Sequence, residues 1–351
     1  MVGPAGHRTR VLLVGAGRRA RETLIPAIHC ASPWIDLVGI CARSERELEL
    51  LGGQFRSTTR RLADVDMGSV DAIVVSVATP NVPGLLGELT DRGASGRILM
   101  LDTPVLEPRD LGSARKFGQF RQVLASEDNF ALPPFVLARQ LVTEGAIGRL
   151  RKIYLFHSGY RHHALAALKQ LTGAQRPKRL VIERSSSWSL EVHVSFPGGI
   201  RATVFEPRHY DVARTMIVGD KGFIVDYPLK HARSVRIGYR TTEGRFLGLT
   251  TNDEPVPPTE LDNALAAGLE GAPLDDPSLM NQLKIRGFME LLSGLSDPSS
   301  RFRYQALDAI DDNLSMLFGE RLPFVPAGRG ALLRTTARVA ARFVPSGGHE
   351  T

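Results

Sequence analysis

Cysteine and tryptophan are the scarcest residues of this 351-residue chain, with two copies of each. Cys30 and Cys41 stand among apolar neighbours, so they offer neither a disulfide framework nor the ligand spacing of a metal site. No apolar run approaches the roughly 18 residues that a membrane-spanning helix needs. The opening MVGPAGHRTR also lacks the long apolar region of a signal peptide. We therefore expect a cytoplasmic, water-soluble protein with no metal.

Positive charge exceeds negative charge. The chain has 44 basic and 37 acidic side chains, a formal net charge of +7 and a pI near 9.7. This balance suits anionic ligands such as nucleotide phosphates. The basic residues are scattered and form no nucleic-acid motif, so we expect no nucleic-acid partner. Arg334, Arg338 and Arg342 follow helical spacing in the tail, but the apolar stripe beside them is thin. We expect an exposed terminal helix there rather than contact with a membrane surface.

The first 125 residues alternate short apolar runs with helical patterns, which predicts a parallel sheet with crossover helices. The apolar runs lack polar alternation, as is typical of strands covered on both faces. The expected strands are 11–15, 37–42, 71–77 and 97–101, and the expected helices are 19–30, 45–55, 82–92 and 109–125.

The pattern changes after a predicted helix at 135–145. The following strand candidates are longer, and several are joined by short glycine turns, which indicates antiparallel neighbours. They are 150–157, 187–196, 200–206, 213–218, 222–226 and 234–240; a loop at 251–260 and helices at 278–295 and 304–317 follow. The expected fold class is therefore α/β plus α+β, a doubly wound parallel sheet followed by a large, mostly antiparallel sheet.

The most informative motif is VLLVGAGRRA, in which Gly15, Gly17 and Ala20 form a GxGxxA pattern. It ends the first predicted strand and begins a helix, the context in which the pattern indicates dinucleotide binding. Gly15 permits the tight turn, Gly17 lets the backbone approach a pyrophosphate, and the helix N-terminus offers free N–H groups. Arg18 and Arg19 belong to the same predicted cofactor loop.

The end of the second strand distinguishes NAD from NADP. NAD-binding proteins usually carry an acidic residue there for the ribose 2′-hydroxyl. In GICARSERE that place is taken by Ala42, followed by Arg43 and Ser44. An arginine beside a hydroxyl can hold a 2′-phosphate, so we favour NADP and keep NAD as the alternative.

Several stretches together resemble the Gfo/Idh/MocA oxidoreductases, the relatives of glucose-fructose oxidoreductase and inositol dehydrogenase. VATPN resembles the family's cofactor loop after the fourth strand, which implies that Thr79, Pro80 and Asn81 line the cofactor. LDTPVLEP occupies the place of its Glu-Lys-Pro segment. PFVLARQLVTEGAIGRLRKIYLF, VGDKGFI and YQALDAIDDNLSML are similar to further family segments, so the resemblance extends from residue 10 to about 325.

The resemblance implies two domains, a Rossmann dinucleotide-binding domain at 1–128 and an α+β substrate and oligomerisation domain at 129–325. The residues beyond them, 326–351, form a basic tail. The resemblance also implies a polyol or sugar-type substrate and a homo-oligomer formed through the second sheet. The family's usual reaction is reversible hydride transfer, which needs a group that moves the hydroxyl proton. In the family a lysine, an aspartate and a histidine do that work.

The residues that match this machinery depart from it. Asp102 stands for the acidic residue of Glu-Lys-Pro, but Thr103 replaces the lysine. The family's histidine falls on His163, whereas its aspartate falls on Ala166. We predict His163 as the acid/base.

Neighbouring polar residues are further candidates. Tyr160 and Lys169 are weighed against ordinary packed or solvated side chains. In SEDNF, Glu127 and Asp128 are either ligand contacts or solvated carboxylates of the crossover between domains.

The sequence thus favours an NADP-dependent oxidoreductase acting on a hydroxyl or ketone of a sugar, sugar nucleotide or cyclitol. Because of Thr103 and Ala166, the alternative is a member that has lost the chemistry and serves as an accessory subunit or sensor. An elimination or epimerisation through transient oxidation is a third possibility.

Overall fold

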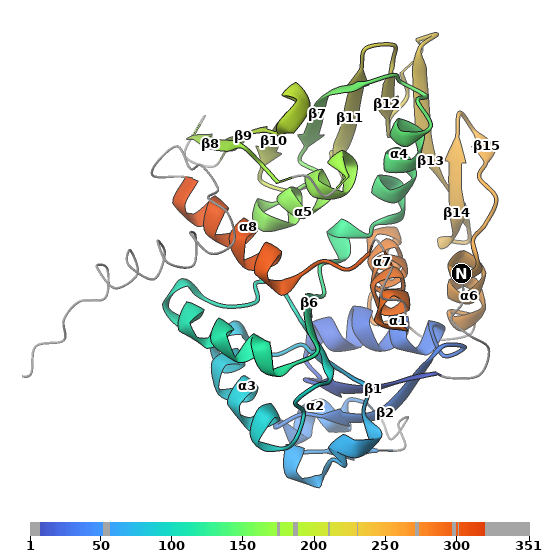
Figure 1. Cartoon of the computed structure of the whole chain (residues 1–351). Coiled ribbons are helices and arrows are strands. Elements are labelled where there is room, and N and C mark those ends of the chain that lie inside the picture. Colours follow the sequence, from blue (N-terminus) through green and yellow to red (C-terminus); the bar gives the residue numbers. More distant parts are fainter. Residues whose placement is uncertain are drawn as a thin grey trace, which may run out of the picture.

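The computed structural model describes residues 8–51, 57–173, 176–184, 189–209, 211–229, 231–270, 274–296, 300 and 302–319. The predicted tail, with its three regularly spaced arginines, lies outside this range. In the described part, one sheet is made by the first third of the chain and a second sheet by the remainder (Figure 1). None of the described helices is both long and apolar enough to cross a membrane.

The first sheet has six parallel strands in the order β3-β2-β1-β4-β5-β6. The order reverses direction between β1 and β4, and ligands of such folds bind at the carboxyl ends of the strands beside that point. The strands are β1 Thr9–Val14, β2 Ile35–Cys41, β3 Thr58–Thr59, β4 Ala72–Val75, β5 Ile98–Leu101 and β6 Gln122–Ala125. This confirms the predicted doubly wound parallel sheet.

The helical segments of this part depart locally from the sequence expectation. The helix expected at 19–30 begins with a π-helical turn before α1, and Ser44 caps a short α2. The prediction of a helix at 109–125 is wrong over its second half. There a 3₁₀ segment ends before β6, because the apolar Val123–Ala125 run pairs with β5 inside the sheet. The segments are η1 Ala20–Leu24, α1 Ile25–Cys30, α2 Glu45–Glu49, η2 Leu62–Asp64, η3 Met67–Ser69, η4 Thr79–Asn81, α3 Val82–Asp91, η5 Pro108–Gln119 and η6 Asp128–Phe130.

The second sheet has nine strands in the order β15-β14-β13-β12-β11-β7-β10-β9-β8. Most neighbours are antiparallel, as predicted, and the β7–β10 and β12–β13 pairs are parallel. The sequence pattern missed β8, β14 and the short β15. The strands are β7 Leu150–Phe156, β8 Arg179–Arg184, β9 Leu190–Ser195, β10 Arg201–Glu206, β11 Arg214–Gly219, β12 Phe223–Val225, β13 Ser234–Thr242, β14 Arg245–Thr251 and β15 Glu254–Pro255.

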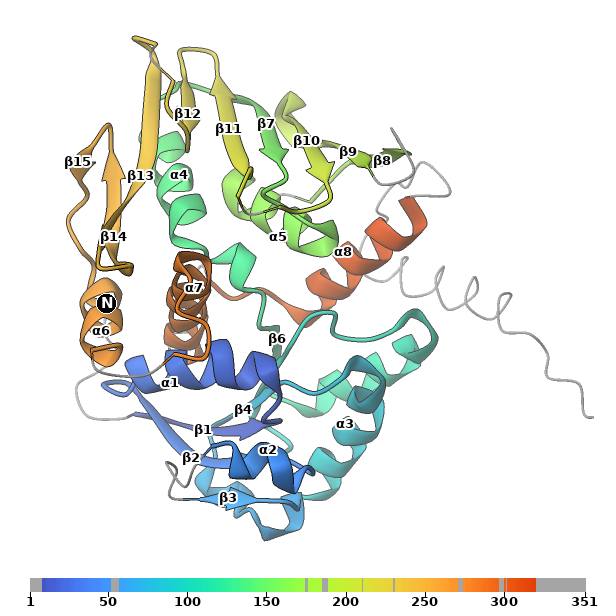
Figure 2. The same cartoon turned by 180° about the vertical axis from the view of Figure 1, so that it is seen from behind.

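Helices cover the face of this sheet that points toward the first sheet, and no described helix covers the other face (Figures 1 and 2). Strand β7 shows the contrast, because Ile153 and Leu155 are buried while Lys152 is exposed and Tyr154 is partly exposed. A 3₁₀ turn, η7 Pro197–Gly199, joins β9 to β10. The helices are α4 Pro133–Thr143, α5 Arg161–Thr172, α6 Glu260–Gly268, α7 Leu279–Ser296 and α8 Ala306–Gly319.

A single buried apolar cluster runs from the first sheet to the second. It joins Val11 and Leu13 of β1 to Phe288 of α7 and then to Ile153 and Leu155 of β7. All of these side chains are fully buried. Because both sheets share this core, the carboxyl ends of β4, β5 and β6 are held in place against α5.

The fold makes one glycine of the motif irreplaceable. Gly15 has a φ of 109°, and a Cβ placed there would lie 2.0 Å from the Ser76 carbonyl oxygen. Gly15→Ala should therefore lower the free energy of unfolding by about 3 kcal/mol or more, measured by urea denaturation. Gly96→Ala is the control, because Gly96 also has a positive φ (77°) but no atom within 4 Å of the added Cβ. Its expected cost is about 1 kcal/mol, and equal losses in the two variants would contradict the packing argument.

Candidate functional site: a buried carboxylate beside a nucleotide pocket

A pocket of about 270 Å³ opens at the carboxyl ends of β1, β2 and β4. It is lined by Gly15, Gly17, Arg43, Ser44 and Asn81, all of which the sequence predicted as cofactor contacts. A Cβ on Gly17 would have Glu47 Oε1 as its nearest neighbour, at 3.6 Å, so the backbone of the glycine loop is open toward the pocket. The remaining loop residues, Arg18, Arg19 and Ala20, begin the helix that follows.

Charged side chains of both signs face this pocket. Arg43, whose side chain is 80% exposed, lies 3.7 Å from Glu88, and Arg60 lies 3.2 Å from Glu45. Arg43, Arg60, Glu47 and Glu88 all line the pocket. The Ser44 hydroxyl accepts the Glu47 N–H as the helix cap, which leaves its own O–H free to donate. The sequence analysis missed Arg60, because it follows the short edge strand β3 and belongs to no motif.

Further along the same sheet edge, the Glu127 side chain is 1% exposed and is the centre of a polar cluster. Its Oε2 accepts a hydrogen bond from Thr103 Oγ1 at 3.0 Å and lies 2.8 Å from His163 Nδ1. Its Oε1 accepts from the backbone N–H and the side-chain amide of Asn129, both at 3.1 Å. Glu127 is thus a buried, fully bonded carboxylate and not a solvated crossover residue. The cluster gathers residues that follow β5 and β6 with one residue of α5.

Glu127 and His163 each shift the ionisation of the other. Burial by itself would raise the pKa of Glu127, but the charge and hydrogen bond of His163, with the Asn129 N–H groups, hold that pKa well below its ordinary value. Burial by itself would lower the pKa of His163, but the Glu127 carboxylate raises it above the ordinary value of 6.5. His163 therefore stays protonated to a higher pH than an ordinary histidine does. Its side chain remains 23% exposed, so the pair is a proton donor held by a buried counter-charge.

His162 behaves in the opposite way. It is buried, its ring lies 4.1 Å from the His163 ring, and neither of its ring nitrogens has a hydrogen-bond partner among the described residues. Burial first, and then the charge of His163, lower the pKa of His162 to about 4. His162 is thus a neutral ring that packs behind a charged one.

Glu127, His162 and His163 are the one group of described residues whose ligand atoms gather closely enough to consider a metal, all within 4.8 Å. The 2.8 Å contact between Glu127 and His163 satisfies both of those ligand atoms as a hydrogen bond. We therefore treat the group as an acid–base pair.

A second ionic network lies next to this cluster. Asp102 accepts hydrogen bonds from Ser76, Ser126 and the Thr103 N–H. Arg19 lies 2.9 Å from Asp128 and 3.8 Å from Asp102. Arg19 is predicted as a loop contact of the cofactor, and in the structure its guanidinium points across the sheet edge to these two carboxylates.

The other two residues predicted as catalytic, Tyr160 and Lys169, lie outside the Glu127 cluster. Tyr160 caps α5, and its ring lies under the guanidinium of Arg161 at 5.4 Å and near that of Arg208 at 5.8 Å. Lys169 faces α8, where its Nζ lies 2.7 Å from Asp312 and above the ring of Tyr304. Thr79 donates to the Pro104 carbonyl oxygen at 3.1 Å and, with Pro80, forms the turn that leads into α3.

Comparisons with known proteins identify the fold. No protein-family model and no curated protein matches the sequence. Solved structures do match, and the chain shares their fold, which is that of Gfo/Idh/MocA-type oxidoreductases.

One similar structure is an Agrobacterium radiobacter oxidoreductase in complex with NAD+, L-tartaric acid and magnesium, with a TM-score of 0.64 and 13% identity over 93% of this chain and 99% of that one. Another is a Corynebacterium glutamicum myo-inositol dehydrogenase, with a TM-score of 0.60 and 14% identity over 91% of this chain and 100% of that one. An NAD-binding oxidoreductase from Klebsiella pneumoniae is similar as well, with a TM-score of 0.64 and 13% identity over 91% of this chain and 100% of that one. At these identities the likeness establishes the fold.

The opposed ionisation of the two histidines can be measured. In ring-nitrogen NMR spectra, His162 should titrate near pH 4 and His163 above its ordinary 6.5. Glu127→Gln should bring the His163 pKa down, because burial then acts without the opposing carboxylate. A His163 pKa that is unchanged by Glu127→Gln would contradict the pairing.

The same pair makes stability depend on pH. The pKa of Glu127 is lower in the folded protein than its ordinary 4.5, so Glu127 stabilises the fold above pH 4.5 and loses this effect as the pH falls through its folded pKa. The pKa of His163 is higher in the folded protein than its ordinary 6.5, so His163 stabilises the fold fully below pH 6.5 and loses this effect as the pH rises through its folded pKa. The stability difference between wild type and Glu127→Gln should therefore be largest between pH 4.5 and 6.5. It should shrink at higher pH.

The Lys169–Asp312 ion pair should stabilise the folded protein rather than take part in turnover. Their side chains are 6% and 4% exposed, so Lys169→Met leaves a buried carboxylate without its cation and should cost about 3–5 kcal/mol of unfolding free energy. Arg176→Met is the control, because Arg176 follows the end of α5 and also pairs with a carboxylate of α8. Arg176 is 41% exposed and lies 3.0 Å from Asp308, so its loss should cost under about 1 kcal/mol. An unchanged melting temperature with lost turnover in Lys169→Met would instead favour a catalytic lysine.

Proposed function

We propose that the protein is an NAD(P)-dependent oxidoreductase that transfers a hydride between a nicotinamide and a hydroxyl or ketone of a sugar, sugar nucleotide or cyclitol. The observation that carries this proposal is the His163–Glu127 pair. It combines a partly exposed imidazolium with a buried carboxylate at the sheet edge that also carries the glycine-loop pocket.

The nicotinamide, when bound, supplies or accepts the hydride. The chain's own residues manage the proton. With Nδ1 of His163 bonded to Glu127, Nε2 is the nitrogen left to donate a proton to a carbonyl oxygen during reduction. The buried carboxylate fixes the ring orientation and stabilises the imidazolium, as a paired acid does in other acid–base sites. In the oxidation direction the neutral imidazole accepts the hydroxyl proton.

Thr103 has a structural place in this scheme although it lacks an amine. Its hydroxyl donates to Glu127 Oε2, so Glu127 keeps a hydrogen-bond donor on the side where β5 ends. Arg19 supplies a positive charge near Asp102, but a guanidinium does not lose its proton at physiological pH and is no base. The proton chemistry therefore depends on His163.

NADP is the cofactor that we favour. Arg43 and Arg60 both line the nucleotide pocket, Ser44 offers a free O–H, and Ala42 stands where an NAD-binding strand usually ends in a carboxylate. NAD is the alternative, because Glu47 and Glu88 line the same pocket and either carboxylate could accept a bond from a ribose hydroxyl.

We further propose that copies of the chain associate through the open face of the nine-stranded sheet. Lys152, Tyr154, His193 and Thr203 line a shallow hollow on that face. Aromatic side chains are enriched where subunits meet, and Tyr154 on this uncovered face supports such a contact. The predicted boundary between domains near residue 128 also belongs to this proposal.

The variant His163→Ala tests the proposed reaction. It should reduce turnover at least about 100-fold and leave cofactor binding within about twofold, because the ring moves a proton and does not hold the nucleotide. In wild type, the reduction rate should fall as the pH rises through the His163 pKa, and the oxidation rate should rise.

The control for this variant is His209→Ala, a histidine whose side chain is 59% exposed. Normal turnover in His163→Ala would refute the assignment. The accessory-subunit alternative makes a different prediction: wild type would bind a dinucleotide, and Thr103→Lys with Ala166→Asp would be needed before any substrate of a sugar panel turned over.

A further inference from the structure

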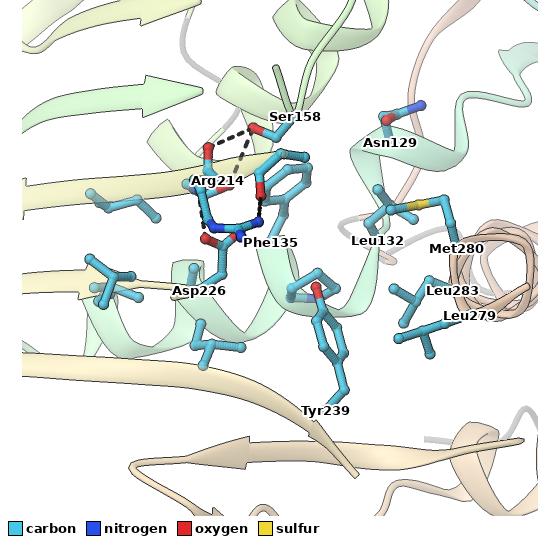
Figure 3. A pocket seen from close by; sticks show the side chains of 18 of the residues that line it. Asn129, Leu132, Phe135, Ser158, Arg214, Asp226, Tyr239, Leu279, Met280 and Leu283 are labelled. Atoms are coloured by element: carbon cyan, nitrogen blue, oxygen red, sulfur yellow. Dashed lines mark hydrogen bonds between the residues drawn. The ribbon is translucent and has the colours of Figure 1, made fainter. Parts of the chain in front are cut away.

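A second cavity, of about 490 Å³, lies between α4, the start of α7 and the covered face of the nine-stranded sheet (Figure 3). It is the size of pockets that bind drug-sized molecules. None of the nucleotide-pocket residues lines it. It therefore has to be explained separately from the cofactor.

Most of the cavity wall is apolar. Leu132 and Phe135 of the α4 region face Leu279, Met280 and Leu283 of α7, and the floor consists of isoleucines from three strands (Figure 3). The floor residues are Ile217 of β11, Ile224 of β12 and Ile237 of β13. Water finds few hydrogen-bond partners in such a space, whereas an apolar ligand displaces that water and fills the volume.

A few polar groups stand at defined places in this wall, among them Arg214, whose positive charge acts on Asp226. The Tyr239 ring lies between Asp226 and the α7 side chains (Figure 3), and its hydroxyl has no hydrogen-bond partner among the described residues. Burial raises the pKa of Asp226, and Thr215 donates its N–H to the carboxyl at 2.7 Å. Burial, and then the charge of Asp226, also raise the pKa of Tyr239. The Tyr239 hydroxyl is therefore a neutral group that can bind an uncharged oxygen or nitrogen of a ligand.

The cavity adjoins the candidate catalytic cluster at one residue. Asn129 lines the cavity, and its side-chain amide donates to both Glu127 Oε1 and Asp128 Oδ1. The remaining cavity residues come from α4, α7, the sheet and the loops that adjoin them. A molecule in the cavity can therefore contact Asn129, whose side-chain amide binds the carboxylate that holds His163.

We propose that this cavity binds the apolar body of an uncharged small molecule whose polar end reaches the Glu127 cluster. This rests on the proposed function in one respect, namely that the polar end is the hydroxyl or ketone that reacts. The substrate is then not a bare sugar or cyclitol. It carries an aryl or alkyl group of roughly ten carbons or more, because several hundred cubic ångströms of apolar space would otherwise be left empty or wet.

The test uses N-phenyl-1-naphthylamine, an uncharged probe whose fluorescence rises in apolar surroundings, with purified cofactor-free protein. Wild type should bind it with saturation. Ala213→Trp, which places an indole in the cavity lining, should weaken binding at least about tenfold by occupying the space. Val212→Trp is the matched control, because the neighbouring Val212 is 52% exposed and does not line the cavity, and it should bind as wild type does.

Parallel NADPH titrations show whether each variant is folded, since the nucleotide pocket is separate. If Ala213→Trp does not fold, Ala138→Leu on α4 fills the same cavity from the other side. Equal probe binding in both tryptophan variants, or no saturable binding in wild type that binds NADPH, would overturn the inference and leave the proposed reaction intact. Probe binding that Ala213→Trp removes in a protein with no turnover would uphold the cavity and refute the reaction.

Discussion

The arrangement of the candidate site depends on one buried charge, the carboxylate of Glu127. A carboxylate that is 1% exposed is stable only when other groups replace its water. Thr103, Asn129 and His163 do so from three segments that are far apart in the sequence. Because Thr103 follows β5, Asn129 follows β6 and His163 lies on α5, satisfying this one charge fixes the first sheet against the helices of the second. The same contacts set the ionisation of His163.

This constraint changes the meaning of the missing lysine. In the sequence, Thr103 looks like the loss of a proton-handling group. In the structure its hydroxyl occupies a defined place as a donor to Glu127, and an ammonium group there would add a further cation beside the His163 imidazolium. A site centred on Glu127 and His163 therefore differs in design from one centred on a lysine, and its threonine is part of that design.

The fold was largely predictable, because unbroken apolar runs, glycine turns and the GxGxxA loop are local signals. The helix prediction at 109–125 was wrong because a short strand follows directly on a helical pattern. Strands β8 and β14 were missed because their alternation of apolar and polar residues is weak. The site was less predictable. His163 was found through the family resemblance, but nothing near Glu127 in the sequence shows that Thr103 and His163 will satisfy it. Likewise, the spacing of Lys169 on its helix does not reveal that Asp312 lies opposite.

The most direct measurement is a fluorescence titration of the purified wild-type protein with NADPH and, in parallel, with NADH. The account predicts saturable binding of a nicotinamide dinucleotide in the pocket beside the glycine loop, with NADPH binding more tightly because Arg43 and Arg60 meet its 2′-phosphate. Tighter binding of NADH would refute the NADP preference alone. Binding of neither would contradict the central claim, because His163 and Glu127 would then have no hydride donor or acceptor with which to work.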